Sequence, residues 1–141
     1  MKSTTEKELS LVITVMNEKE NILPLIDSIR TSLSGIEYEV VFADDGSSDG
    51  TVQEIIKCSD DHIVIVELRR NYGQSTAMTA GIDHSSGKYI ALLDGDLQND
   101  PSDIPKMLQI LKEQDCDVVA GNRKNRKDNM FFRKIPSAIA N

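Results

Sequence analysis

Short apolar runs rich in β-branched residues alternate five times with segments of helical periodicity, and this alternation restricts the chain to very few folds. The apolar runs predict strands at residues 9–15, 38–43, 63–68, 88–93 and 117–120. Because the runs are continuously apolar, each strand is expected to be buried on both of its faces. The sequence therefore predicts an α/β fold with a mainly parallel sheet that carries helices on both faces.

Apolar stripes and prolines place the helices between these strands. One stripe consists of Ile22, Leu25, Ile26, Ile29 and Leu33. Pro24 fits this helix only in the first turn, which predicts a helix start near Asn21. The helix between the fourth and fifth strands is expected to have Asn99 or Asp100 as its cap, with Pro101 just inside its start.

Length and charge indicate one soluble domain. The 141 residues suffice for a single core, and 39% hydrophobic with 28% charged residues excludes a disordered chain. The net charge of −7 argues against a nucleic-acid-binding surface. Six Lys or Arg nevertheless fall within residues 123–134, which indicates an anionic partner at that end. We divide the chain into a polar tail of residues 1–8, a core of residues 9–122 and a basic segment of residues 123–141.

The sequence contains no candidate membrane span and no cysteine framework. Its longest strongly apolar run, residues 11–16, is far shorter than the ~20 residues of a membrane helix, and residues 1–10 are too polar for a signal peptide. Cys58 and Cys116 lack the CxxC spacing of metal or redox sites. A reducing compartment fits this usage of cysteine.

Polar clusters follow directly after three of the predicted strands. Residues 17–18 follow the first strand, residues 44–45 the second and residues 94–96 the fourth. In a parallel sheet the carboxyl ends of the strands lie at one edge, where ligands bind. Carboxylates gathered there repel one another unless a cation holds them. The sequence therefore predicts an acidic ligand site at this edge.

Asp94-Gly95-Asp96, with Gln98 close behind, indicates a metal site. In an extended stretch, residues two apart point to the same side, so Asp94 and Asp96 can bind one ion. Gly95 lets the backbone turn and lets a ligand approach. Two carboxylates and an amide oxygen form a hard set of ligands suited to Mg²⁺ or Mn²⁺, with the phosphates of a ligand completing the shell.

Structural roles are the alternatives for the other clusters. Either Asp44 or Asp45 can form an Asx-turn that caps the next helix while the other binds a ligand. Glu18 can stabilise its helix through the dipole rather than bind a ligand. His62 and His84 have no metal-ligand spacing and no nearby nucleophile, so we expect ordinary edge residues.

Three segments, in order, resemble the signatures of family 2 glycosyltransferases, which have the GT-A fold. They are residues 14–21 (TVMNEKEN), 43–51 (ADDGSSDGT) and 93–101 (LDGDLQNDP). The DGDLQ form and residues 71–74 (NYGQ) are most similar to the polyprenyl-phosphate sugar transferases, such as dolichyl-phosphate mannose synthase and the bacterial undecaprenyl-phosphate glycosyltransferases. Thr14 and Met16 stand where the family often has Pro and Tyr. Members of this branch usually continue further, so the resemblance implies a truncated GT-A domain.

The resemblance implies three kinds of site. Asp94, Asp96 and Gln98 would bind the metal, with Asp94 and Asp96 as the catalytic pair. Arg123 and Arg133 match positions at which the family contacts phosphate. The residues implied for the nucleotide sugar are Thr14, Met16, Glu18, Asp44 or Asp45, and Asp94.

The implied reaction is one inverting displacement at the anomeric carbon of the sugar, with a nucleoside diphosphate leaving. A divalent cation offsets the charge that develops on the diphosphate. A polyprenyl phosphate is already anionic near neutral pH, so this acceptor needs no strong general base. A saccharide hydroxyl would need a carboxylate base from outside this chain.

The expected partners are a UDP- or GDP-sugar and a lipid phosphate at the cytoplasmic face of the cell membrane, with a homo-oligomer left open. Met130, Phe131 and Phe132 are then expected to dip into the membrane interface. The alternative for this segment is a solvated charged loop whose two Phe residues pack in the core.

Two other α/β classes are excluded and one alternative function stays open. A signalling receiver domain needs an acid pair after the first strand, an Asp after the third and a Lys after the fifth, but residues 17–18, 68–70 and 121–123 are of other types. A dinucleotide-binding domain needs GxGxxG after the first strand, and no such motif follows residues 9–15. A catalytically inert nucleotide-sugar-binding module stays open.

Overall fold

The computed structural model describes residues 7–97, 100–115, 117–121 and 130–134, which form one six-stranded sheet in the order β3-β2-β1-β4-β6-β5. The strands are β1 (Leu9–Val15), β2 (Tyr38–Asp44), β3 (Ile63–Glu67), β4 (Tyr89–Asp94), β5 (Val118–Gly121) and β6 (Met130–Lys134). The helices are α1 (Lys19–Ser32), α2 (Thr51–Cys58), α3 (Gln74–Asp83) and α4 (Ile104–Glu113), preceded by a 3₁₀ turn, η1, at Pro101–Asp103. The predicted α/β fold is confirmed.

Four strands, β3, β2, β1 and β4, run parallel. All seven residues of β1 are buried, as expected for a strand with apolar residues on both faces. The register pairs Val15 with Asp44 and Thr14 with Asp94. The carboxyl ends of β1, β2 and β4 therefore reach the same edge of the sheet.

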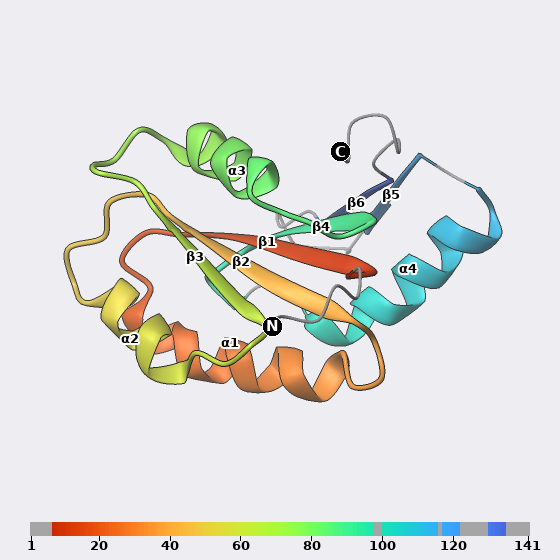
Figure 1. Ribbon diagram of the computed structural model, residues 1–141, viewed down its shortest axis with the longest axis horizontal. Helices are drawn as coiled ribbons and strands as arrows, with labels where there is room; N and C mark the ends of the chain where they lie inside the picture. The colour runs from red at the N-terminus through yellow and green to blue at the C-terminus, as the bar shows by residue number, and fades with distance from the viewer. Residues whose placement is uncertain (1–6, 98–99, 116, 122–129, 135–141) are drawn as a thin grey trace, which may run out of the picture.

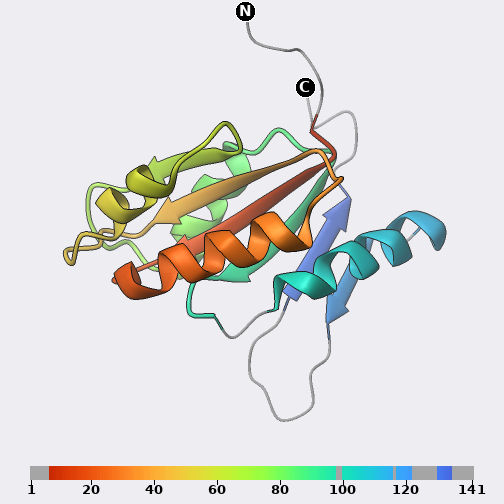
Figure 2. The same ribbon diagram turned by 90° about the horizontal axis from the view of Figure 1, so that it is seen from below.

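Helices cover the two faces of the sheet unequally (Figures 1 and 2). Helices α1, α2 and α4 lie on one face, and α3 lies on the other. Side chains alternate along β1, so Leu11 and Ile13 belong to a large core shared with α1, α2 and α4, whereas Val12 belongs to a small core shared with α3. Gly81 allows α3 to approach closely, because a Cβ at this position would lie 2.5 Å from Val12 Cγ1.

Strand β6 lies inside the basic segment of residues 123–141, where the sequence analysis predicted no strand. Its backbone pairs antiparallel with β4 on one side and with β5 on the other (Figure 2). A strand paired on both sides contradicts the solvated loop of one alternative. The core packing or membrane contact expected for Phe131 and Phe132 depends on side chains that lie outside the described ones. The sequence does not reveal this strand because its partners are distant in the chain: Phe132 pairs with Ala91 of β4.

Helix α1 begins at Lys19, earlier than predicted, so Pro24 lies in the second turn rather than the first. Pro24 is exposed, and water can hydrate the Glu20 carbonyl that lacks an N–H partner there. The prediction for the later helix is confirmed, because the Asp100 side chain accepts a hydrogen bond of 3.0 Å from Ser102 N.

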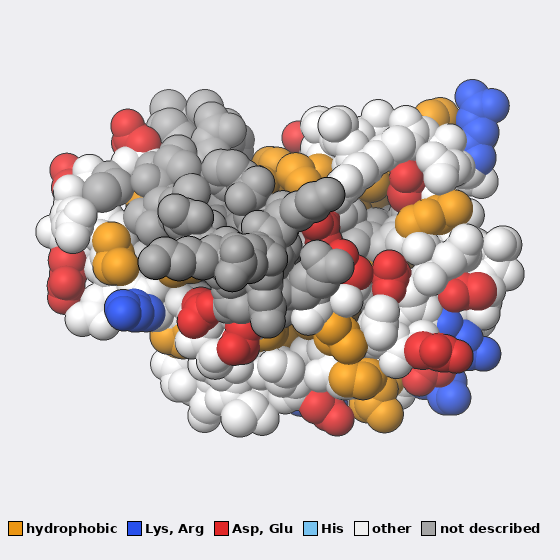
Figure 3. All heavy atoms as spheres, turned by 180° about the vertical axis from the view of Figure 1, so that it is seen from behind, with side chains coloured by type: hydrophobic (Ala, Val, Ile, Leu, Met, Phe, Trp, Pro, Cys, Tyr) orange, Lys and Arg blue, Asp and Glu red, His pale blue; other side chains and the backbone are white. Residues whose placement is uncertain are grey.

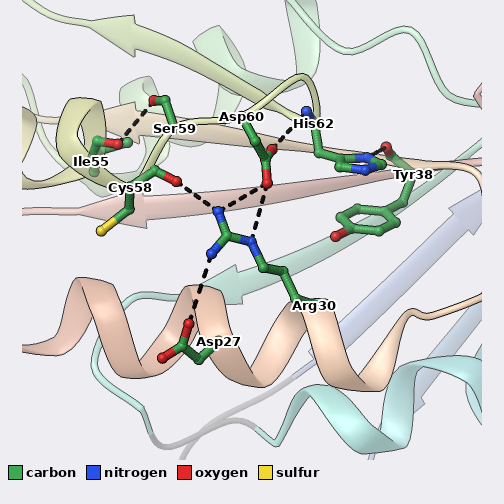
Figure 4. Close-up of polar contacts among 8 residues, drawn as sticks. All are labelled: Asp27, Arg30, Tyr38, Ile55, Cys58, Ser59, Asp60 and His62. Atoms are coloured by element: carbon green, nitrogen blue, oxygen red, sulfur yellow. Dashed lines mark hydrogen bonds and ion pairs between the residues drawn. The ribbon is translucent and has the colours of Figure 1, made fainter.

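Arg30 of α1 ties this helix to the loop before β3, at the end of the sheet opposite the carboxyl edge (Figure 4). Its Nε and Nη2 atoms donate to Asp60 Oδ2 over 3.1 and 2.9 Å, and Nη2 also donates to Cys58 O over 2.8 Å. The His62 ring stacks on Tyr38, with centroids 4.3 Å apart. His62 therefore has the ordinary edge position that the sequence predicted.

Cys58 is a free, half-buried thiol at the end of α2. Burial raises its pKa, so little reactive thiolate is present near neutral pH. Cys116 lies outside the described residues. No helix in the described part of the chain is long and apolar enough to cross a bilayer.

Candidate functional site

A cleft of about 250 Å³ lies at the carboxyl edge of the sheet, where β1 and β4 end and α3 begins. It is lined by Thr14, Val15, Met16, Glu18, Asp45, Gln74, Asp94, Gly95 and Asp96. The structure thus brings together most of the residues predicted for the nucleotide sugar and both acids predicted for the metal. Asp44 does not line the cleft, and Gln98 lies outside the described residues.

Strand register explains why Thr14 and Asp94 lie side by side in this cleft. They are register partners in the adjacent strands β1 and β4. Two residues earlier in each strand, Val12 and Leu92 pack in the small core beneath α3. Because side chains alternate along a strand, Thr14 and Asp94 point to this same face, at the N-terminal end of α3.

Gly95 lets the chain turn close to β1 immediately after Asp94. Its N–H donates to Thr14 O over 3.1 Å. A Cβ at Gly95 would lie 2.6 Å from Val15 Cγ1 and 3.2 Å from Thr14 O, so a larger residue would push β1 and β4 apart. The close approach predicted for Gly95 is therefore an approach to β1. Leu97 then turns the chain outward with a left-handed φ of 66°.

The two adjacent acids Asp44 and Asp45 make different contacts. Asp44 is 1% exposed, and its Oδ2 accepts a hydrogen bond of 3.1 Å from Ser47 N within the loop. The expected cap of the next helix comes instead from Asp49, whose Oδ1 accepts from Thr51 N at the start of α2. Asp45 lines the cleft, and its carboxylate accepts hydrogen bonds from Tyr72 N (2.8 Å) and Gly73 N (3.1 Å). Asp45 thus anchors the loop before α3 while it faces the cleft.

Gln74, the first residue of α3, contacts two cleft residues at once and was not among the predicted site residues. Its Nε2 donates to Asp94 Oδ1 over 2.5 Å and lies 3.4 Å from Thr14 Oγ1. Thr14 Oγ1 in turn donates to Asp94 Oδ1 over 3.5 Å. The sequence signals for Gln74 were its place in the NYGQ segment of residues 71–74 and its position directly after Gly73, at the start of a helix that follows a strand.

Hydrogen bonds connect the loop after β1 to the loop after β2 at the mouth of the cleft. Asn17 N donates to Ser47 Oγ over 2.8 Å, and Asn17 Oδ1 accepts from Ser48 N over 2.8 Å. Glu18 lines the cleft and is the N-cap residue of α1, without a side-chain capping bond. Its N–H donates to Thr51 Oγ1 over 3.0 Å, so the start of α2 holds the backbone of Glu18 in place.

The oxygen ligands in the cleft fit a hard divalent cation. Asp94 and Asp96 face the cleft together, with Asp45 and Glu18 also on its lining. Within the described residues, no three His, Cys, Asp or Glu side chains are grouped closely enough to hold a metal by themselves. Two carboxylates leave coordination positions for a ligand's phosphates, as the sequence analysis expected.

The two arginines predicted to bind phosphate have no described side chains. Arg123 lies outside the described residues, and Arg133 is described only through its backbone, which pairs with Ile90 of β4 and Val118 of β5. On the face in Figure 3, acidic side chains outnumber basic ones on the described surface. This distribution agrees with the net charge of −7.

The chain is similar to several known proteins. The model of glycosyl transferase family 2 matches residues 10–139. A dodecaprenyl-phosphate galacturonate synthase of Rhizobium johnstonii is 45% identical over 139 residues, which cover 95% of this chain and 41% of that protein. An undecaprenyl-phosphate 4-deoxy-4-formamido-L-arabinose transferase of Salmonella typhimurium is 42% identical over 140 residues, covering 96% of this chain and 42% of that protein. The chain thus spans about two fifths of the length of these relatives.

Two solved structures share the fold at low sequence identity. A mannosyltransferase of Pyrobaculum calidifontis, in complex with GDP-Man and Mn²⁺, has a TM-score of 0.76 and 18% identity over 92% of this chain and 45% of that one. A glucosyl-3-phosphoglycerate synthase of Mycobacterium tuberculosis, in complex with Mn²⁺ and UDP, has a TM-score of 0.62 and 24% identity over 74% of this chain and 39% of that one.

Proposed function

This chain belongs to glycosyl transferase family 2, and from that premise we propose that it carries the donor site of an enzyme that moves a sugar from a nucleoside diphosphate to a polyprenyl phosphate. The observation that carries the proposal is the cleft in which Asp94 and Asp96 lie beside Asp45 and Glu18. Relatives named for dodecaprenyl- and undecaprenyl-phosphate support the class of acceptor. Their galacturonate and arabinose products leave open whether the sugar is a hexose or a pentose.

Asp94, Asp96 and Gln98 are the proposed metal ligands. When bound, Mg²⁺ or Mn²⁺ would neutralise the charge that develops on the departing diphosphate. The chain's own task is to hold two carboxylates at one place, and the short turn at Gly95 and the pairing of β4 with β1 keep them there. Structural neighbours with Mn²⁺ support a divalent cation.

The nucleoside is proposed to bind beside Thr14, Met16, Glu18 and Asp45. All four line the cleft, and the 36% exposed Met16 offers an apolar surface to a base. Asp45 retains acceptor capacity after its two backbone contacts, because a carboxylate can accept about four hydrogen bonds. Asp44 is proposed to shape the turn that presents Asp45. UDP and GDP are both compatible with this arrangement.

An anionic acceptor explains why the cleft needs no histidine. The two histidines lie elsewhere: His62 stacks on Tyr38, and His84 follows the end of α3. A phosphate acceptor attacks without losing a proton to a base. Arg123 and Arg133 are proposed to bind phosphate, which gives the basic segment its role. The cytoplasmic face of the cell membrane is the proposed location, and self-association stays open.

The rate of sugar transfer from donor to acceptor tests the proposal directly. We expect the complete protein to release UDP or GDP from a sugar nucleotide when Mn²⁺ and a polyprenyl phosphate are present. Asp96→Asn should reduce this rate at least about 100-fold, because one charged ligand is lost from the site. Asp83→Asn, at an exposed acid at the end of α3, is the matched control and should retain the rate.

Two outcomes would contradict this assignment. Metal-dependent binding of a sugar nucleotide without turnover would favour the inert binding module. Turnover that ignores both Mn²⁺ and Asp96→Asn would remove the metal site from the mechanism.

A further inference from the structure

We propose that Gln74 is a positioning residue of this site, whose side-chain amide fixes the orientation of the Asp94 carboxylate. The inference rests on the proposed function, in which Asp94 is a metal ligand. Gln74 lines the cleft, and its Nε2 is the donor that contacts Asp94 Oδ1 at 2.5 Å. A carboxylate only accepts hydrogen bonds, so the amide nitrogen of Gln74, and not its oxygen, must face Asp94.

The backbone of Gln74 is held by contacts to the sheet. Gly73 N donates to Asp45 Oδ2 over 3.1 Å and to Asn71 Oδ1 over 3.1 Å. Gly73 O then accepts from Ala77 N, which begins the helix. Asp45 itself is fixed to β1, because its N–H donates to Val15 O over 3.0 Å. Gln74 therefore projects from a point anchored to the ends of β1 and β2.

Through this amide, three elements meet at one oxygen atom. Asp94 Oδ1 accepts from Gln74 of α3 and from Thr14 of β1, and Asp94 itself ends β4. The two contacts of Thr14 Oγ1, at 3.4 and 3.5 Å, are at the limit of hydrogen-bonding distance. Of these two contacts to Asp94 Oδ1, the one from Gln74 is therefore the stronger and the one from Thr14 the weaker.

A neutral amide suits this place for an electrostatic reason. A Lys here would neutralise Asp94 and repel a divalent cation. A Glu would add a third negative charge and could not donate a hydrogen bond to Asp94 when ionised. Gln donates without changing the net charge of the site, so the carboxylate is oriented in advance while its affinity for a cation is kept. Groups that orient metal ligands typically contribute about 10–100-fold in affinity.

The test measures Mn²⁺ binding by electron paramagnetic resonance in the complete protein, with the metal alone, with UDP and with GDP. Gln74→Met keeps the length of the side chain without a donor, and Gln74→Glu keeps its shape without the donor. We expect Gln74→Met to bind Mn²⁺ about tenfold more weakly, with an unchanged unfolding midpoint. Gln74→Glu loses the same donor but adds a negative charge that attracts the cation, so its loss should be smaller. Gln53→Met, at an exposed glutamine of α2, is the control and should bind as the unsubstituted protein does.

A variant of Thr14 tests whether the Gln74 amide contributes more to Mn²⁺ binding than the Thr14 hydroxyl does. Thr14→Val removes only the hydroxyl from a buried strand position and should weaken Mn²⁺ binding by less than Gln74→Met does. In turnover, the rate of the Gln74 variants should approach that of the unsubstituted protein as Mn²⁺ is raised, because the ligands themselves remain.

The outcomes distinguish this inference from the proposed function. Unchanged Mn²⁺ affinity in Gln74→Met, with a loss in Asp96→Asn, would overturn the positioning role and leave the proposed function intact. No Mn²⁺ binding by the unsubstituted protein, or equal binding by Asp96→Asn, would overturn both.

Discussion

At the scale of single residues, Gly46 shows how tightly the loops around the cleft are packed. Its φ is +80°, and a Cβ there would lie 2.6 Å from both Arg70 C and Asn71 N. These are backbone atoms of the loop that Asp45 anchors, so they cannot move aside without disturbing the contacts of Asp45 with Tyr72 and Gly73. Gly46 is therefore required for two reasons, its left-handed backbone conformation and its close packing against this loop.

Gly46→Ala should consequently lower the free energy of unfolding by about 3 kcal/mol, since it combines left-handed strain with a steric clash. Urea unfolding measures this loss. Gly35→Ala is the matched control, because Gly35 has a similar φ of +89° but no atom within 4 Å of its Cβ position. It should lose only about 1 kcal/mol, the cost of the strain alone. Equal losses in the two variants would contradict the packing argument.

The sequence predicts which residues gather near the site better than it predicts the role of each one. Asp44 and Asp45 were both candidates, and only their positions at the end of β2 decide that Asp44 is buried in the turn while Asp45 faces the cleft. Gln74 was missed because its contacts to Thr14 of β1 and Asp94 of β4 depend on how α3 packs on the sheet. Such contacts between residues far apart in sequence have no local pattern.

At the scale of elements, Arg30 and the loop between α2 and β3 form a separate anchor at the other end of the sheet (Figure 4). Burial raises the pKa of the Asp60 carboxyl, but the hydrogen bonds from His62 N and Arg30 lower it more, so the pKa lies below its ordinary value of 3.8. A carboxyl group whose pKa is lowered on folding stabilises the protein above the pKa of its unfolded state. That stabilisation is lost as pH falls through the lower pKa of the folded state.

Arg30→Met should cost about 1 kcal/mol of stability at pH 7, because the fork to Asp60 and the bond to Cys58 O are lost. The cost should shrink as pH falls below 3.8, since protonated Asp60 no longer gains from the guanidinium. Urea unfolding at pH 7 and pH 3 measures both values.

Lys57→Met is the control for Arg30→Met. Its partner Glu54 lies 3.5 Å away, but the Lys57 side chain is 74% exposed, so this pair should contribute only a few tenths of a kcal/mol. A pH-independent cost for Arg30→Met would mean that packing of the arginine stem, and not its charge, stabilises the loop.

The bounds of helices and strands can be predicted where the local sequence determines them. They cannot be predicted where they depend on pairing with a strand that is distant in the chain. The buried strands β1 and β2 and the cap at Asp100 follow from apolar runs and from Asx chemistry. The start of α1 was predicted too late, because Pro24 is tolerated in the second turn on the exposed side of the helix. Strand β6 was missed because its sequence lies beside a basic block and its partners are distant in the chain.

At the scale of the whole molecule, β6 joins two parts of the sheet. It follows the predicted core of residues 9–122 in the chain, but it lies between β4 and β5 in the sheet. Within the described part of the chain, β5 pairs with β6 and not with β4. Without β6, the edge of β4 and the whole of β5 would lose their ladder partners, and unpaired strand edges favour aggregation.

A chain cut after Gly121 should therefore be far less stable than one cut after Lys134, although both contain every described residue of the cleft. We expect an unfolding midpoint lower by roughly 10 °C or more, or a loss of the monomer to aggregation, by calorimetry and size-exclusion chromatography. Residues 1–134 are the matched control, because they keep the pairs Leu92–Phe131 and Val119–Phe132 that join the two halves of the sheet. If residues 1–121 fold as cooperatively as residues 1–134, the four parallel strands are a complete core and β6 is only an addition to their edge.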